Sequence, residues 1–344
     1  HWVAVFGNGY NSASDRAYLY IVDLASGTRL ARIPAGVQTG NGLSTPALID
    51  TDGDKISDYA YAGDLKGNLW KFDLKSNDPA AWTSALQDGG QAIPLFIARD
   101  ASQKLQPITA RPVLSLPTGL AGQPKGGVMV FFGTGRYLTA SDPADTSTQS
   151  FYAIWDNGSQ ATVRHNEATD PQEQLQRQII EAATREFGED VRTSSANKVD
   201  YGSQRGWYMD LTDAGERVIS TALLRYNRII FATTIPLTDD VCQPDGTGWL
   251  MELDAYNGAR TAVSVFDFTP DGLFDDKDLL ASGQTASGVK STVGMIKTPV
   301  WLESAPESQL AFKQLSGTSG AIRALKNRKP PAAAAQRVFW RQIQ

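Results

Sequence analysis

The sequence predicts an all-β fold, a β-propeller that carries a short helical insertion. Three observations predict it: strand-and-turn segments that repeat along the chain, short strands led by proline, and a composition rich in turn formers. The chain has 31 glycines and 17 prolines in 344 residues, with 41% hydrophobic and 20% charged residues, which is typical of a globular protein. We expect residues 1–344 to form one propeller domain or most of one.

Five segments share one plan, in which alternating aromatic and aliphatic residues lead into an acidic residue and a Gly- or Asn-containing turn. They are residues 19–27, 69–74, 151–158, 206–215 and 248–258. A strand-like segment ending in glycine or a small turn precedes all but the fourth, at residues 3–9, 59–63, 128–135 and 228–234. Proline leads three further short strands, at Pro46, Pro112 and Pro299. Such short, repeated strands favour propeller blades. An irregular β-sandwich is the alternative.

One segment, about residues 165–195, departs from the strand pattern. Asp170 followed by Pro171 is typical of a helix N-cap and first helical position. Apolar residues then recur every four positions, at Leu175, Ile179, Ala183 and Phe187. This spacing predicts a short amphipathic helix inserted between blades and packed against the propeller. A helix that docks a partner is the alternative.

The two ends of the chain carry expectations of their own. The first residues are already strand-like, without Met or a signal-peptide pattern. We therefore expect a piece of a longer protein, whose upstream N-terminal region, with any targeting signal, is absent here. A basic, Pro/Ala-rich connector over residues 326–335 precedes a segment of strand composition, so a C-terminal strand is expected at about residues 336–344.

Charge and residue counts exclude several function classes. A net charge of −5 argues against a nucleic-acid partner, and no apolar run approaches the ~20 residues that a membrane span requires. The single cysteine, Cys242, excludes an intrachain disulfide and a cysteine-based zinc site. With His1 and His165 as the only histidines, a Ser-His-Asp triad is disfavoured. We expect a binding module with no catalytic residues.

The most specific motif is the nine-residue loop of residues 50–58, with carboxylates at positions 1, 3, 5 and 9. Calcium takes six to eight oxygen ligands in a flexible shell, which alternating carboxylates in a tight loop supply. No His or Cys lies nearby, which disfavours zinc. The predicted Ca²⁺ ligands are Asp50, Asp52, Asp54, the carbonyl of Ile56, and Asp58. An acidic surface turn without an ion is the alternative.

The loop differs from an EF-hand, because Tyr61 stands where the bidentate glutamate would be and Lys55 where glycine would be. Its flanks have strand composition, which indicates a calcium loop seated in a β-hairpin. A second candidate spans residues 267–275, where Thr269 replaces a carboxylate and Pro270 stiffens the turn. A plain turn is the competing interpretation there.

Residues 45–74, TPALIDTDGDKISDYAYAGDLKGNLWKFDL, resemble the C-terminal domain of PilY-type proteins, which are bacterial type IV pilus biogenesis factors and tip adhesins. Two shorter stretches, residues 3–10 and 246–254, support the resemblance. It implies a modified, quinoprotein-like propeller and a calcium site, at the loop residues named above, that regulates pilus extension and retraction. It also implies a place at the cell surface or on the pilus, and roles in twitching motility, adhesion and virulence.

The partners implied by the resemblance are pilin or minor pilins and host surface molecules. The sequence contains no Arg-Gly-Asp, so integrin binding through that tripeptide has no support. A quinoprotein-type dehydrogenase is the alternative function, since it shares the propeller and also uses calcium. One cysteine and a calcium loop on a hairpin disfavour that alternative.

Overall fold

The computed structural model describes residues 2–163, 165, 174–237, 246–305 and 308–329. Within these residues the chain forms β-strands and three short 3₁₀ turns, and no helix is long and apolar enough to cross a membrane. The 3₁₀ turns are η1 (Pro79–Ala81), η2 (Asp142–Ala144) and η3 (Asp276–Asp278). The all-β prediction is therefore confirmed.

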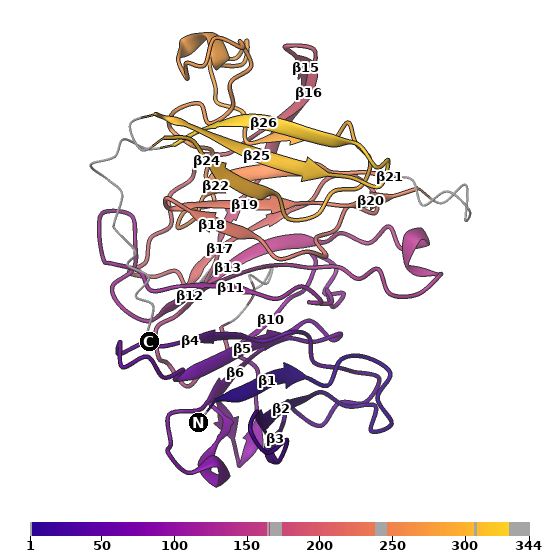
Figure 1. Ribbon diagram of the computed structural model, residues 1–344, viewed down its shortest axis with the longest axis vertical. Coiled ribbons are helices and arrows are strands. Elements are labelled where there is room, and N and C mark those ends of the chain that lie inside the picture. Colours follow the sequence, from indigo (N-terminus) through magenta and orange to yellow (C-terminus); the bar gives the residue numbers. More distant parts are fainter. Residues whose placement is uncertain (1, 164, 166–173, 238–245, 306–307, 330–344) are drawn as a thin grey trace.

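The described residues form five sheets of three or more strands, whose order in space broadly follows the sequence (Figure 1). The first contains β1 (Val3–Gly7), β2 (Tyr18–Asp23) and β3 (Arg29–Pro34). The second has the order β10 (Phe96–Ile97), β6 (Asn68–Asp73), β5 (Tyr59–Gly63) and β4 (Ala47–Ile49), with β7 (Thr83–Ser84) also paired to β6. The third has the order β11 (Val113–Ser115), β12 (Val128–Gly133), β13 (Ser150–Asp156), β17 (Gly206–Asp210) and β14 (Gln176–Gln178).

The remaining strands complete the other two sheets and two small ribbons. The fourth sheet has the order β15 (Ile180–Glu186), β16 (Glu189–Ser194), β23 (Gly288–Lys290), β22 (Trp249–Asp254), β19 (Arg228–Ala232) and β18 (Leu223–Arg225). The fifth contains β24 (Val300–Glu303), β25 (Leu310–Ser316) and β26 (Ile322–Arg328). The ribbons pair β8 (Gln87–Asp88) with β9 (Gln91–Ala92), and β20 (Ile235–Pro236) with β21 (Gly246–Thr247).

The central strands bury both of their faces, which is how propeller blades pack. In β12 and β13, Phe131 and Phe151 lie in the core shared with the fourth sheet, while Val130 and Tyr152 lie in the core shared with the second. Successive strand residues point to opposite faces, so a strand buried on both sides reads as a continuous apolar run. The separate clusters between successive sheets explain why these strands lack polar alternation.

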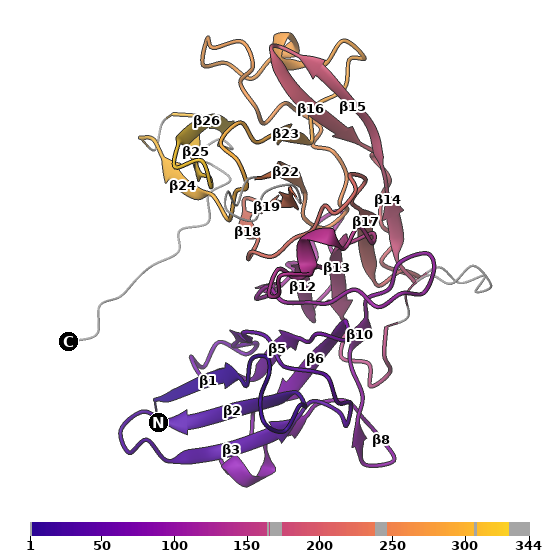
Figure 2. The same cartoon turned by 90° about the vertical axis from the view of Figure 1, so that its right-hand side faces the viewer.

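Figure 2 shows the five sheets along an arc, with the first sheet at one end and the fifth at the other. Face-to-face contacts fill each junction. Leu19 and Trp70 belong to one buried cluster between the first and second sheets, and Ile230 and Leu315 belong to another between the fourth and fifth. Sheets that pack face to face along an arc are the arrangement of a propeller, as predicted, and not of a two-layer sandwich.

Each predicted repeat contains a strand, but the repeats do not correspond one to one with the sheets. The fourth repeat forms β17, which pairs with β13 of the third repeat in the same sheet, Ser150 opposite Asp210. This explains why the fourth repeat has no preceding strand of its own, since β13 takes that place. The fifth sheet contains β25 and β26, which lie outside the repeats.

The predicted helical insertion is wrong where the structure describes it. Residues 176–194 form β14, β15 and β16, and Phe187 and Gly188, with φ of 55° and 79°, make the two-residue turn of the β15–β16 hairpin. Two successive positive φ values are typical of a type I′ hairpin turn. The supposed apolar stripe is not a buried face, because Ile179 and Phe187 are 45% and 40% exposed. Asp170 and Pro171, and the expected strand at 336–344, lie outside the described residues.

A buried carboxylate fastens the sheet that carries the candidate site. Asp64 follows β5 and accepts hydrogen bonds from Asn68 Nδ2 and Trp70 Nε1, both at 2.8 Å. It also accepts one from Asn41 Nδ2 at 2.9 Å, and Asn41 belongs to the connection between β3 and β4. Because all three donors converge on one buried side chain, the β5–β6 turn is tied to the segment that leads into β4.

Candidate metal centre

The predicted metal loop closes the β4–β5 hairpin of the second sheet. The strands pair from Ala47 opposite Tyr61 to Ile49 opposite Tyr59, so residues 50–58 are the loop between them. The Asp58 N–H donates to the Ile49 carbonyl at 2.8 Å, and the Asp58 carbonyl accepts from Leu74 N at 2.8 Å. Asp58 is therefore fixed to the sheet through its backbone while its carboxylate faces the loop.

The loop winds around its own carboxylates. Asp50 accepts hydrogen bonds from the N–H groups of Gly53 at 2.6 Å and Lys55 at 2.7 Å. Asp52 accepts from Asp54 N at 3.0 Å, and Asp54 accepts from Ile56 N at 2.7 Å. These bonds require tight turning, and Gly53 and Lys55 accordingly have φ of 87° and 74°. The backbone N–H groups offset part of the repulsion between the acids.

Three carboxylates of the loop meet the distance requirement of a single calcium ion. Asp50, Asp52 and Asp58 each offer an oxygen, and these oxygens lie within 4.8 Å of one another. Calcium binds oxygen at about 2.3–2.6 Å, so ligands on opposite sides of one ion are about 4.6–5.2 Å apart. Hard carboxylate oxygens are also the donors that calcium prefers. The residues present therefore fit the ion.

The other two predicted ligands, Asp54 and the carbonyl of Ile56, are not part of this group of converging carboxylates. Asp54 instead receives the Ile56 N–H. The Ile56 side chain is exposed, and its carbonyl remains a predicted ligand. The Gly53 N–H holds the pKa of Asp50 below its ordinary value, with the N–H groups of Lys55 and Asp52 acting in the same direction against burial. Asp50 is therefore ionised and ready to bind a cation at neutral pH.

The acids of the second candidate loop, residues 267–275, form ion pairs with lysines of the same chain. Lys326 Nζ lies 3.0 Å from the Asp267 carboxylate and 3.4 Å from the Pro270 carbonyl. Lys277 Nζ lies 3.3 Å from Asp271. Among the described residues these acids do not form a metal-ligand group. Because lysine ammonium groups already neutralise the loop, it has the character of an ion-paired turn.

A cavity of about 450 Å³ opens beside the metal loop, between the second and third sheets. We call it the interblade cavity. The loop residue Thr51 and the neighbouring Tyr59 line it, together with Lys71 of β6 and Asp156 at the end of β13. Lys71 Nζ lies 2.7 Å from Asp156 Oδ2, and both side chains are buried. Tyr61 Oη donates to the same oxygen at 2.7 Å.

The buried pair of Lys71 and Asp156 was not predicted from the sequence, although the sequence contains a signal for it. Lys71 interrupts the apolar run of β6, a strand that is buried on both faces. Lysine is almost never buried unless it is paired, so its position predicts a carboxylate partner. The partner, Asp156, is 85 positions away in the sequence and belongs to another sheet, so its identity required the fold.

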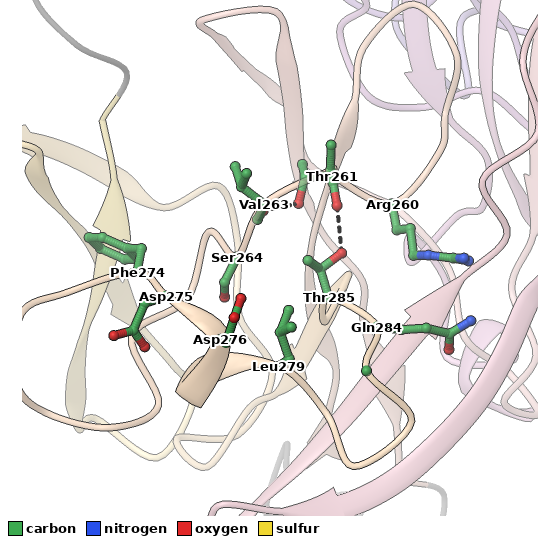
Figure 3. A pocket seen from close by; sticks show the side chains of 12 residues that line it. Arg260, Thr261, Val263, Ser264, Phe274, Asp275, Asp276, Leu279, Gln284 and Thr285 are labelled. Atoms are coloured by element: carbon green, nitrogen blue, oxygen red, sulfur yellow. Dashed lines mark hydrogen bonds between the residues drawn. The ribbon is translucent and has the colours of Figure 1, made fainter.

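A smaller cavity of about 250 Å³ lies by the fourth sheet (Figure 3). The Thr285 hydroxyl donates to the Thr261 carbonyl at 2.6 Å across it. Arg260 points to one side and pairs with Glu181 at 2.9 Å. The polar side chains of this cavity therefore already bond to neighbouring segments of the chain.

Comparison with known proteins assigns the chain to a family. The family model of the PilY1 beta-propeller domain matches residues 1–188, more than half of the chain. The chain belongs to the PilY1 β-propeller family. This confirms the resemblance carried by residues 45–74, and it agrees with the propeller seen in the structure.

Two PilY1 relatives and one solved PilY1 structure extend the comparison. A type IV pilus biogenesis factor PilY1 homolog of Xylella fastidiosa is 39% identical over 281 residues, covering 77% of this chain and 18% of that protein. PilY1 of Pseudomonas aeruginosa is 36% identical over 307 residues, covering 80% of this chain and 26% of that protein. The crystal structure of the P. aeruginosa PilY1 C-terminal domain aligns with a TM-score of 0.77 at 29% identity, covering 96% of this chain and 70% of that one.

The chain thus spans about a quarter or less of the length of these curated relatives. Nearly the whole of this chain aligns with the solved C-terminal domain of PilY1.

Proposed function

We propose that this chain is the calcium-binding propeller module of a type IV pilus biogenesis factor, and that it acts by binding and not by catalysis. The observation that carries the calcium part is the convergence of Asp50, Asp52 and Asp58 oxygens within 4.8 Å of one another. The pilus part is supported by relatives named type IV pilus biogenesis factors.

The proposed ligands are the three converging carboxylates, followed by Asp54 and the carbonyl of Ile56. Bound calcium supplies positive charge that offsets the mutual repulsion of the acids. Asp58 then connects the ion to the sheet, because its own N–H and carbonyl are bonded to Ile49 and Leu74. We expect a dissociation constant of about 10⁻⁷–10⁻⁵ M, the range of calcium sensors.

We further propose that occupancy of the loop regulates pilus extension and retraction, and with them twitching motility and surface attachment. We infer that the partners are pilin or minor pilins and host surface molecules, and that the module acts at the cell surface or on the pilus. A site on one hairpin of one sheet suits this role, since metal binding there changes a local surface and not the packing between sheets.

The proposal that the module is not an enzyme has a direct test. A quinoprotein dehydrogenase carries a coloured cofactor in its propeller, so an absorbance scan of the purified protein distinguishes the two functions. A cofactor band at stoichiometric level, together with dye reduction by an alcohol substrate, would support a dehydrogenase.

The pilus role is tested in the full-length protein in its own bacterium. Asp58→Ala removes a ligand oxygen on the side of the site that is fixed to the sheet, and we expect altered surface pilus numbers and twitching. Asp88→Asn is a matched control, because Asp88 is exposed in β8 and does not belong to the converging carboxylates. Pili are counted with and without a calcium chelator. Unchanged pili and motility in Asp58→Ala would contradict the regulatory role.

A further inference from the structure

The interblade cavity has a charged floor that is built from buried groups. Lys71 is 6% exposed and its ammonium lies 2.7 Å from Asp156 Oδ2. Its Nζ also lies 4.1 Å from the centroid of the Tyr59 ring. An ammonium group has three N–H donors, and Asp156 is the one carboxylate paired with it in the described part of the chain. Donors therefore remain for an oxygen that enters the cavity.

A second lysine gives the cavity a net positive charge. Lys75 is exposed, lines the cavity, and places its Nζ 4.6 Å from the Tyr59 ring centroid. Lys71 and Lys75 are thus two ammonium groups against the single carboxylate of Asp156, which leaves a formal charge of +1 on the lining. The group that best complements such a lining is an anion of one unit charge, such as a carboxylate.

The remaining walls suit a peptide better than a small free acid. Leu116, Pro117 and Val128 provide apolar surface. Gly126 also lines the cavity, with a φ of 69° and open space where a Cβ would stand. Glycine lets another backbone approach closely because it has no Cβ. The volume of about 450 Å³ lies within the range of ligand-binding pockets.

The cavity shares residues with the metal loop. Thr51 lines the cavity, and its N–H donates at 2.7 Å to Asp58 Oδ2. Tyr59 lines the cavity and directly follows Asp58 in the chain. The four loop aspartates and Lys55 together carry a formal charge of −3, which a calcium ion reduces to −1. An anion in the cavity is therefore repelled less when the loop holds calcium.

We propose that the interblade cavity binds a carboxylate presented by an acidic peptide segment of a partner protein, and that calcium in the metal loop strengthens this binding. The coupling rests on the proposed function, because it requires the loop to hold calcium. By linkage, the acidic peptide strengthens calcium binding by the same factor. The affinity of the module for its partner thus depends on the calcium concentration.

The test uses fluorescence anisotropy with a labelled peptide of about six residues that contains two aspartates and is blocked at both ends. Its twin, the control peptide, has asparagine in place of both aspartates. The chain is titrated with each peptide in millimolar calcium and in chelator. Lys75→Gln removes the exposed ammonium without disturbing the buried pair, and Lys297→Gln, at an exposed lysine that does not line the cavity, is the matched control.

We expect the aspartate peptide to bind at least fivefold more tightly than its twin, and about fivefold more tightly in calcium than in chelator. Lys75→Gln should abolish the preference for aspartate, whereas Lys297→Gln should bind as the wild type does. Equal binding of the two peptides, or an unchanged preference in Lys75→Gln, would overturn the carboxylate site. Inorganic phosphate that binds where the aspartate peptide does not would overturn it as well.

A calorimetric calcium titration of the same samples separates the two proposals. Calcium binding without any effect on peptide affinity overturns the coupling. Peptide binding that depends on Lys75, in a chain that gives no calcium heat, overturns the calcium proposal and supports the carboxylate site.

Discussion

The Asp58 carboxylate closes the base of the metal loop by accepting hydrogen bonds from Thr51 twice, from the backbone N–H at 2.7 Å and from the side-chain hydroxyl. Both bonds end on Oδ2. Asp58 is also 7% exposed, whereas Asp52 is exposed. Thr51 therefore holds the most buried ligand of the loop in a fixed direction before any ion arrives, and it connects the loop to the interblade cavity.

Replacing Thr51 by valine should weaken calcium binding without removing a ligand. Valine keeps the size of threonine but lacks the hydroxyl, and one hydrogen bond contributes about 0.5–1.5 kcal/mol. We expect the dissociation constant to rise about threefold to tenfold. Thr51→Ser keeps the hydroxyl and should stay close to wild type. Calorimetry on the three proteins measures the difference, and wild-type affinity in Thr51→Val would contradict the positioning role.

Removing calcium should loosen one loop and leave the propeller folded. The cores between the sheets do not involve the loop, and the site lies within a single hairpin. At 100 times the dissociation constant, calcium stabilises the folded chain by about 2.7 kcal/mol. Chelator should therefore lower the melting temperature by several degrees, with an unchanged far-ultraviolet circular dichroism spectrum. Global unfolding on chelation would show that the ion is required for the fold.

Asp58→Lys should imitate the calcium-bound state, unlike Asp58→Ala. A lysine here brings a tethered ammonium to Asp50 and Asp52, as Lys326 does for Asp267 in the loop of residues 267–275. In the full-length protein we expect Asp58→Lys to keep surface pili but to lose the response to chelator. Pilus counts in both variants, with and without chelator, decide between loop charge and coordination of a partner by the ion. A lysine variant that behaves like the alanine variant would exclude the charge mechanism.

Asp142 should make part of the stability dependent on acid. Burial raises its pKa, but the N–H groups of Leu138 and Thr139 and the charge of Arg136 outweigh burial, and the pKa lies below its ordinary value of 3.8. The stabilisation is thus complete above the ordinary pKa and is lost as pH falls through the lowered one. Asp142→Asn should cost about 1–3 kcal/mol at pH 7 and progressively less below about pH 4. Urea unfolding of the wild type and Asp142→Asn at pH 7 and below about pH 4 tests this. The same difference in unfolding free energy at both pH values would contradict it.

The local features of the fold could be predicted from the sequence because short-range chemistry determines them. The loop of residues 50–58 and its flanking strands follow from alternating acids between two β segments. The helix prediction failed because a spacing of four residues also occurs along a hairpin, and the Phe187-Gly188 turn was not recognised. The pairing of β17 with β13 and of Lys71 with Asp156 depends on long-range packing. Local patterns carry no information about such partners.

Calcium binding through Asp50, Asp52 and Asp58 is tested by calorimetric titration of the chain with calcium, beside Asp52→Asn and the control Asp88→Asn. Asn keeps the shape of the aspartate side chain and removes its charge, so the fold is preserved. We predict one site at about 10⁻⁷–10⁻⁵ M in the wild type and the control, with at least tenfold weaker binding in Asp52→Asn. Absence of heat at millimolar calcium in the wild type, or unchanged affinity in Asp52→Asn, would contradict the claim.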